Sequence, residues 1–180
     1  MSKYRRVVTG HDEEGKAIIA MDGGPGIRRG NLYEMWCTQS MPTHNRELVD
    51  AVATRPGFLE PDPNGTIFRF FEVRPERELG SREDREREQE ERLAAMSEAE
   101  REATLSRRPD TSRHPGMHKT KTVDYIILLK GEVTMLVDKG EVDLKPFDVV
   151  IQRGTNHAWV NKADETAVLV AMMVEAEPLD

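Results

Sequence analysis

A row of polar side chains follows the stretch that begins at His118. Residues 120–129 are rich in β-branched and aromatic residues, which predicts a strand. Side chains two apart on a strand share a face, so His118, Thr120, Thr122 and Asp124 are expected on one side of it. Apolar and aromatic side chains, Tyr125 among them, would occupy the other side. The polar row therefore either faces solvent or lines a cavity.

A second cluster follows the glycine turn at Gly154. Residues 157–161 are expected to form a strand on which His157, Trp159 and Asn161 share a face. Two imidazoles and a carboxylate on neighbouring strands match the two-histidine, one-carboxylate set that leaves open positions on a divalent metal. The metal ligands predicted in this way are His118, Asp124 and His157. The alternative is a metal-free interior in which the histidines are hydrogen-bonded and the aspartate caps or bridges.

Other residues of the same stretch are candidates for supporting roles. The candidates for proton handling are Tyr125, Thr120 and His114. The candidates for shaping a substrate pocket are Trp159, Asn161 and Thr122. Both threonines have an ordinary alternative as strand formers with satisfied hydroxyl groups. His11 and His44 lie in loop-like segments without a partnering acid and are expected on the surface.

Composition narrows the class of protein. The 180 residues suffice for one domain, and the formal net charge of −7 offers no basic face for nucleic acid or for an anionic membrane. No apolar run approaches the roughly 20 residues of a membrane span. The single cysteine, Cys37, excludes an intramolecular disulfide and suits a reducing compartment. We therefore expect a cytoplasmic protein that binds a small molecule, with no nucleic-acid or membrane partner.

Short strands at close spacing predict an antiparallel barrel or sandwich. Before the middle of the chain the expected strands are residues 4–9, 16–21, 31–38 and 66–73, with Arg69 or Glu72 facing outward on the last. A short helix is expected around residues 46–54. After the middle of the chain the expected strands are residues 120–129, 132–137, 141–144, 149–152, 157–161 and 166–174. The expected division is N-terminal strands and a loop over residues 1–65 that pack on a barrel formed by residues 66–180.

A charged insertion interrupts the strands at about residues 78–108. Between Ser81 and Glu102 there are five arginines and nine acidic residues, without proline or glycine, which predicts helix. Ser97 and Glu100 fit a capping box, so a second helical segment is expected to start near Ser97. A helix so polar has little to bury and is expected to be a solvated excursion. The alternative is a lid over the barrel mouth.

These motifs resemble those of the cupin superfamily. The run from His118 to Gly131 resembles the first cupin motif, with Asp124 in the place of its glutamate. The run from Gln152 to Asn161 resembles the second, with Gly154, His157 and Asn161 as the matching positions. The resemblance implies an all-β, jelly-roll type antiparallel barrel, here with a charged helical insertion. It also implies a homodimer, to which an N-terminal strand such as residues 4–9 could contribute.

Departures from the motifs weaken the site that the resemblance implies. Thr120 stands in the place of the second histidine of the first motif, Gln152 in the place of a proline, and Phe147 where glycine is usual. At most three conventional ligands remain for iron, manganese, nickel or zinc.

Two hypotheses follow from this reduced ligand set. The first is a metal-dependent enzyme acting on a small organic molecule, with oxidoreductase or dioxygenase-like chemistry. The second is a metal-free barrel that serves as a lyase or isomerase, binds a ligand, or is a structural dimer.

Overall fold

The computed structural model describes residues 3–45, 48–55 and 59–178. Most of its regular structure is strand. The strands are β1 (Arg6–His11), β2 (Ala17–Gly23), β3 (Ile27–Arg29), β4 (Leu32–Thr38), β5 (Thr66–Val73), β6 (Thr122–Lys130), β7 (Val133–Val137), β8 (Gly140–Leu144), β9 (Val149–Arg153), β10 (His157–Val160) and β11 (Ala167–Glu175). The helices are α1 (Ala51–Thr54), α2 (Arg82–Ala94) and α3 (Glu98–Ser106), with a 3-10 turn, η1 (Glu76–Glu78).

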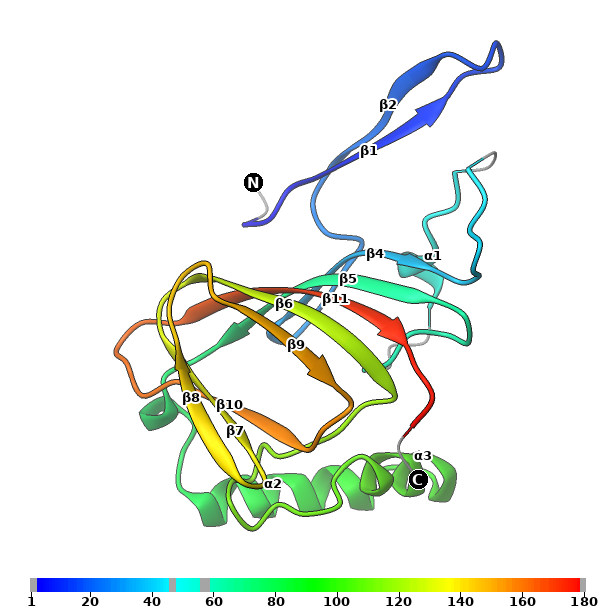
Figure 1. Cartoon of the computed structure of the whole chain (residues 1–180). Helices are drawn as coiled ribbons and strands as arrows, with labels where there is room; N and C mark the ends of the chain where they lie inside the picture. Colours follow the sequence, from blue (N-terminus) through cyan, green and yellow to red (C-terminus); the bar gives the residue numbers. More distant parts are fainter. Residues whose placement is uncertain (1–2, 46–47, 56–58, 179–180) are drawn as a thin grey trace.

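The strands form antiparallel sheets, as the sequence predicts. The largest sheet has the order β3-β4-β5-β11-β6-β9, and a smaller one has the order β10-β7-β8. In Figure 1 these two sheets lie face to face, with α2 and α3 along one side of the molecule. The prediction of an all-β fold with a charged helical insertion is confirmed.

Alternation along β5, β6 and β11 sorts their side chains between the two faces of the large sheet. Ile67, Leu128 and Leu169 are almost completely buried and belong to the main core. The polar row of β6 is also inward, because Thr122 and Asp124 are buried while Tyr125 between them is exposed. The polar row therefore lines the interior. Arg69, which was one of two residues expected to face outward on β5, points inward and is 2% exposed. Its charge is buried together with that of Glu34, with which it forms an ion pair.

The helical insertion is solvated, as its composition predicts. Neither α2 nor α3 has a buried residue. Each begins with a capping box: Ser97 with Glu100, as expected, and Ser81 with Asp84, which the sequence reading missed because aspartate stands where the motif usually has glutamate. These caps satisfy the free N–H groups at the start of helices that gain little from packing.

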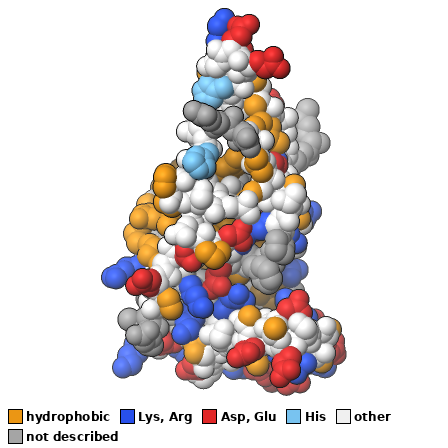
Figure 2. Space-filling view, turned by 90° about the vertical axis from the view of Figure 1, so that its right-hand side faces the viewer, with side chains coloured by type: hydrophobic (Ala, Val, Ile, Leu, Met, Phe, Trp, Pro, Cys, Tyr) orange, Lys and Arg blue, Asp and Glu red, His pale blue; other side chains and the backbone are white. Residues whose placement is uncertain are grey.

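The N-terminal region joins the rest of the fold in two different ways. β3 and β4 extend the large sheet through β5, whereas β1 and β2 pair with each other as a separate two-stranded sheet. Figure 2 shows this hairpin standing clear of the body of the molecule. The expected helix at residues 46–54 is reduced to α1, and residues 46–47 lie outside the described residues. The division at residue 65 remains a prediction. None of the described helices is long and apolar enough to cross a membrane.

Phe147 occupies a backbone conformation that favours glycine, which explains why its position stood out in the sequence. Its φ is 76°, its side chain is 79% exposed, and its N–H donates to the carbonyl of Leu128 at 2.7 Å. A bulky residue with positive φ is strained by roughly 1–2 kcal/mol.

Phe147→Gly is therefore expected to raise the free energy of unfolding by about 1 kcal/mol relative to Phe147→Ala, because only glycine relieves the backbone strain. Chemical denaturation of the two variants measures the difference, and comparison with each other removes the effect of losing the phenyl ring. Equal stability of the two variants would show that the turn is unstrained.

Candidate functional site

The centre of the candidate site is a pair of histidines held together by a backbone bridge. The N–H of His118 donates to the carbonyl of His157 at 2.9 Å, and the N–H of His157 donates back at 2.8 Å. This isolated antiparallel bridge places the imidazole centroids 4.5 Å apart. It also explains why β6 begins at Thr122, two residues later than expected: the chain before it pairs towards β10 instead.

A backbone carbonyl lies beside one nitrogen of each ring. Nδ1 of His118 lies 2.9 Å from the carbonyl oxygen of Gly116, and Nδ1 of His157 lies 2.9 Å from that of Thr155. A carbonyl can only accept, so Nδ1 of His118 carries a proton. Nδ1 of His157 also lies 2.8 Å from the amide nitrogen of Gln152, which can only donate, so the contacts of this ring are compatible with either tautomer. Within the described chain neither Nε2 atom has a hydrogen-bond partner, and that of His118 is left as an electron-pair donor.

Burial keeps both imidazoles neutral. Burial lowers the pKa of His118. The hydrogen bond to Gly116 raises this pKa, and the positive charge of Arg108 lowers it further. Burial lowers the pKa of His157 to about 3, with a further contribution from His118. A neutral histidine whose Nδ1 donates to a carbonyl, as that of His118 does, is in the form in which histidine binds metals, since ligating histidines usually donate their other N–H to such an acceptor.

Asp124 lies in the same interior but in a different setting. It pairs across β6 and β9 with Gln152, and its carboxyl atom Oδ1 has no hydrogen-bond partner among the described residues. Burial raises the pKa of Asp124 to about 6, against the opposing effects of Thr122 and Arg69. The result is a carboxyl group that can exchange a proton near neutral pH.

The structure brings together two of the three expected ligands. In the described residues no group of three His, Cys, Asp or Glu side chains is placed to hold a metal ion. The histidine pair fits a metal through its Nε2 atoms, whereas Asp124 is not grouped with it. The assignment of His118, Asp124 and His157 as a complete ligand set stays a prediction.

Of the expected supporting residues, Trp159 lies beside His157, and Thr120 is paired with Thr122. The ring of Trp159 is 5.7 Å from that of His157 and nearly perpendicular to it, which suits a pocket wall. Thr120 is buried, and its hydroxyl accepts a hydrogen bond from Thr122 at 2.7 Å. The two threonines thus satisfy each other, as their ordinary alternative requires.

Three other candidates are placed away from the pair. Tyr125 is 51% exposed on the outer face of the large sheet. Asn161 is fully buried, and its side chain donates to the carbonyls of Val73 and Glu165 and accepts from the N–H of Ala163. These hydrogen bonds fix the chain between β10 and β11. His114 contacts Glu76 through Nε2 at 3.0 Å and receives the N–H of Gly116 at Nδ1.

Two residues near the site were missed from the sequence. Gln152 touches His157 and is the only fully buried residue of β9; the signal was a polar side chain at an inward position of an apolar strand. Glu76 lies in η1, far from His114 in sequence, and no local pattern marks it. Although burial opposes it, hydrogen bonds from His114 and Arg85 hold the pKa of Glu76 below its usual value.

Comparison with known families agrees with this fold. A family model described as a cupin domain matches residues 108–174, which include both histidines and Asp124. This part of the chain thus matches a cupin domain, as its motifs predicted.

Similar proteins include members of fungal biosynthetic clusters. Phomopsin biosynthesis cluster protein C' of Diaporthe leptostromiformis is 41% identical over 66 residues, which are 36% of this chain and 35% of that protein. The match thus spans about a third of that relative's length. The cupin-domain-containing oxidoreductase fogC of Aspergillus ruber is 23% identical over 171 residues, covering 89% of this chain and 66% of that protein. Among solved structures, a cupin 2 conserved barrel domain protein from Salinispora arenicola is 15% identical, with a TM-score of 0.37 over 68% of this chain and 70% of its own.

The raised pKa of Asp124 predicts how stability changes with pH. The pKa of Asp124 is near 3.8 in the unfolded chain and about 6 in the folded protein, so the folded state holds the proton more tightly. The free energy of unfolding therefore falls as pH rises from about 4 to 6, and the loss is complete above that range. Asp124→Asn removes the effect. Its stability relative to the unaltered protein should improve by up to about 3 kcal/mol between pH 4 and pH 8.

Urea unfolding at several pH values measures this difference, in which contributions from the histidines cancel. The matched control is Glu132→Gln, at an exposed position in the turn before β7. A stability difference between Asp124→Asn and the unaltered protein that stays constant from pH 4 to pH 8 would contradict the assignment.

Proposed function

We propose that the protein binds a small organic molecule beside His118 and His157 and acts on it in an oxidoreductase-type reaction that depends on a divalent transition metal. The observation that carries this proposal is the histidine pair, in which each Nδ1 lies 2.9 Å from a carbonyl oxygen and neither Nε2 has a partner among the described residues. Similarity to proteins named cupin-domain-containing oxidoreductases supports the reaction class.

The proposal gives each nearby residue a distinct task. His118 and His157 would hold the metal through Nε2, and iron, manganese, nickel or zinc suits imidazole ligands. Such a metal would supply a Lewis acid for a substrate oxygen or a binding position for dioxygen. Trp159 forms a wall beside His157. Tyr125, on the outer face, has no part in this arrangement.

Asp124 is assigned to proton handling instead of ligation. Its unpartnered Oδ1 and its pKa of about 6 suit a group that takes up and releases a proton near neutral pH. Thr120 and Thr122 lie on the same inward side, and their hydroxyl chain orients polar groups next to it. With only two histidine ligands, the remaining coordination positions fall to substrate or water.

The setting proposed for this chemistry is the reducing cytoplasm. Cys37 is buried, and burial raises the pKa of its thiol, which keeps it protonated and unreactive.

A second role, as an interaction surface, is favoured by the outer face of the large sheet. Phe68, Met172, Tyr125 and Ile151 form one cross-strand row, and Phe70, Val170, Ile127 and Val149 form the next. Tyr4 of the N-terminal segment stacks on Phe70 with centroids 4.6 Å apart and covers only that end. Most side chains of the two rows are more than a third exposed, from Phe68 on β5 across β11 and β6 to β9.

The occupant that we propose for this face is a second copy of the chain. With up to about 250 Å² per large side chain, the exposed members and Leu129 present roughly 600 Å² of apolar surface. That is the upper limit for a monomeric protein and close to the ~800 Å² per partner of a stable interface. A continuous apolar face can pack on its own copy by two-fold symmetry, which gives a homodimer.

Metal content tests the first proposal. Protein purified without a histidine tag is expected to take up about one equivalent of a divalent transition metal, and His118→Ala and His157→Ala to bind it at least about tenfold more weakly. His11→Ala, at an exposed position in β1, is the matched control. Equilibrium dialysis with elemental analysis measures the binding. Uptake below about 0.1 equivalent, or equal uptake by all variants, would remove the metal from the account.

Sedimentation velocity tests the second proposal. The unaltered protein is expected to be a dimer at about 100 µM, and Ile151→Lys to be monomeric there because it buries a charge in the interface. Leu105→Lys, on α3 with 49% exposure, should stay dimeric. A monomeric unaltered protein would overturn the proposal. Dissociation by Ile19→Lys, in the hairpin, but not by Ile151→Lys would place the contact on the N-terminal strands instead.

A further inference from the structure

A continuous chain of hydrogen bonds connects Glu76 with the imidazole of His118. The carboxylate of Glu76 lies 3.0 Å from Nε2 of His114. Nδ1 of His114 accepts the N–H of Gly116 at 3.0 Å, and the carbonyl of Gly116 lies 2.9 Å from Nδ1 of His118. A single residue, Gly116, thus contacts one histidine through its N–H and the other through its carbonyl.

The contacts with Gly116 and Glu76 set the arrangement of protons, because Arg85 is farther from Nε2 of His114, at 3.3 Å, and donates to Glu76 at 2.5 Å. The N–H of Gly116 can only donate, so Nδ1 of His114 carries no proton and its neutral ring is protonated at Nε2, which donates to Glu76. The carbonyl of Gly116 can only accept, so His118 carries its proton at Nδ1. The two histidines are therefore opposite tautomers.

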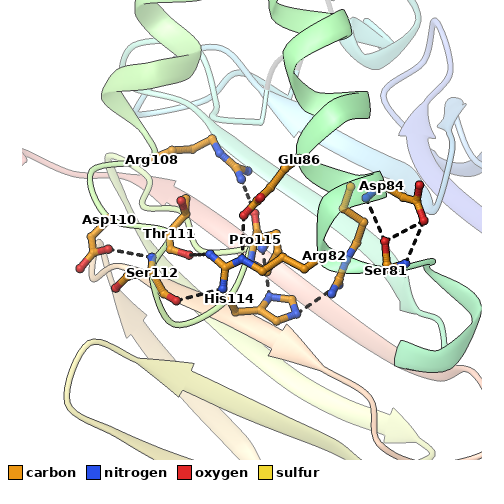
Figure 3. A network of polar contacts seen from close by, with 12 residues as sticks. Ser81, Arg82, Asp84, Glu86, Arg108, Asp110, Thr111, Ser112, His114 and Pro115 are labelled. Carbon is orange, nitrogen blue, oxygen red and sulfur yellow. Dashed lines mark hydrogen bonds and ion pairs between the residues drawn. The ribbon is translucent and has the colours of Figure 1, made fainter.

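The charged insertion holds this chain of contacts in place. Arg85 of α2 donates to Glu76 at 2.5 Å, so that one carboxylate oxygen accepts from both Arg85 and His114. Arg82 donates to the carbonyls of Thr111 and Ser112, both at 3.1 Å. Figure 3 shows His114 between the start of α2 and the loop that carries these two residues. The solvated helices thus fasten the loop that leads to His118.

The fit between His114 and Gly116 is tight. A Cβ added at position 116 would lie 2.9 Å from Nδ1 of His114, closer than real Cβ contacts, and 3.1 Å from its Cε1, which is tighter than most. The position accepts only glycine while the ring of His114 is in place. The loop geometry at Gly116 and the orientation of His114 therefore depend on each other.

We propose that Glu76 and His114 are positioning residues that act through Gly116 to fix the tautomer and orientation of His118, leaving its Nε2 directed to a ligand. His114 does not touch substrate or metal in this scheme. The value of the arrangement for binding rests on the proposed function, but the tautomer itself is a property of the protein alone. Contacts of this kind typically change metal affinity by about 10–100-fold.

Long-range ¹H–¹⁵N correlation spectra of protein with labelled histidines test this directly, because they distinguish Nδ1–H from Nε2–H. In the unaltered protein we expect His118 as a pure Nδ1–H tautomer and His114 as the Nε2–H tautomer. His114→Leu should abolish the single-tautomer pattern of His118. His114→Asn should restore it, since the asparagine oxygen can accept the Gly116 N–H in the place of Nδ1.

Two controls separate positioning from general damage. The pattern of His157 should be unchanged in every variant, because it depends on Thr155 and Gln152. Arg113→Ala loosens the same loop by removing contacts with Glu141 and Gly140 and should leave His118 unchanged. A pure Nδ1–H tautomer at His118 in His114→Leu would overturn the proposal, as would an equal loss in Arg113→Ala.

The tautomer spectra test the positioning role and the metal measurements test the proposed function, so either proposal can be overturned without the other. If the tautomers are as expected and no metal binds, the positioning holds and the proposed function is wrong. If the unaltered protein binds Zn²⁺ and His114→Leu binds it about tenfold more weakly while His114→Asn does not, both hold. Full affinity in His114→Leu together with an unchanged tautomer would leave the metal site and remove the positioning role.

Discussion

The antiparallel bridge between His118 and His157 is the constraint on which the rest of the site depends. Two backbone hydrogen bonds join the segment before β6 to the start of β10, and the imidazoles have to be neighbours because their backbones are paired. Burial lowers the pKa of both rings. The carbonyl of Gly116 then decides which nitrogen of His118 is left without a proton. Local backbone geometry, more than side-chain packing, thus shapes the candidate site.

The helical insertion, which lies outside the two facing sheets, contributes to the candidate site through the segment before β6. The helical insertion buries nothing, yet its arginines fasten η1 and the loop from Thr111 to Gly116. A polar, solvated element is well suited to that task because hydrogen bonds to carbonyls and carboxylates have defined directions, whereas apolar contacts do not. The large sheet separates the two proposed functions: the polar candidate site lies on its inner face, and the apolar surface proposed for a second copy lies on its outer face.

Much of this could be predicted from the sequence, and the exceptions have physical reasons. Period-two patterns located β5 with its bounds, and β6 and β11 within two residues, and the glycine turns separated the later strands. The two histidine motifs predicted His118 and His157 on neighbouring strands, and the structure pairs their backbones. Placing Asp124 with them as a ligand stays a prediction, since a shared face does not fix distance along a twisted strand. Tyr125 lies on the outer face, as alternation alone required, and Asn161 is used entirely by backbone groups. Glu76 could not be found, since its partner is 38 residues away.

The central claim is that His118 and His157, without Asp124, form the metal-binding centre. Anomalous diffraction from crystals grown with Mn²⁺ or Zn²⁺ tests it most directly. The account predicts one strong peak about 2.0–2.2 Å from Nε2 of both histidines, with the carboxylate of Asp124 outside bonding distance. A peak coordinated by Asp124, or metal bound only at the protein surface, would contradict it.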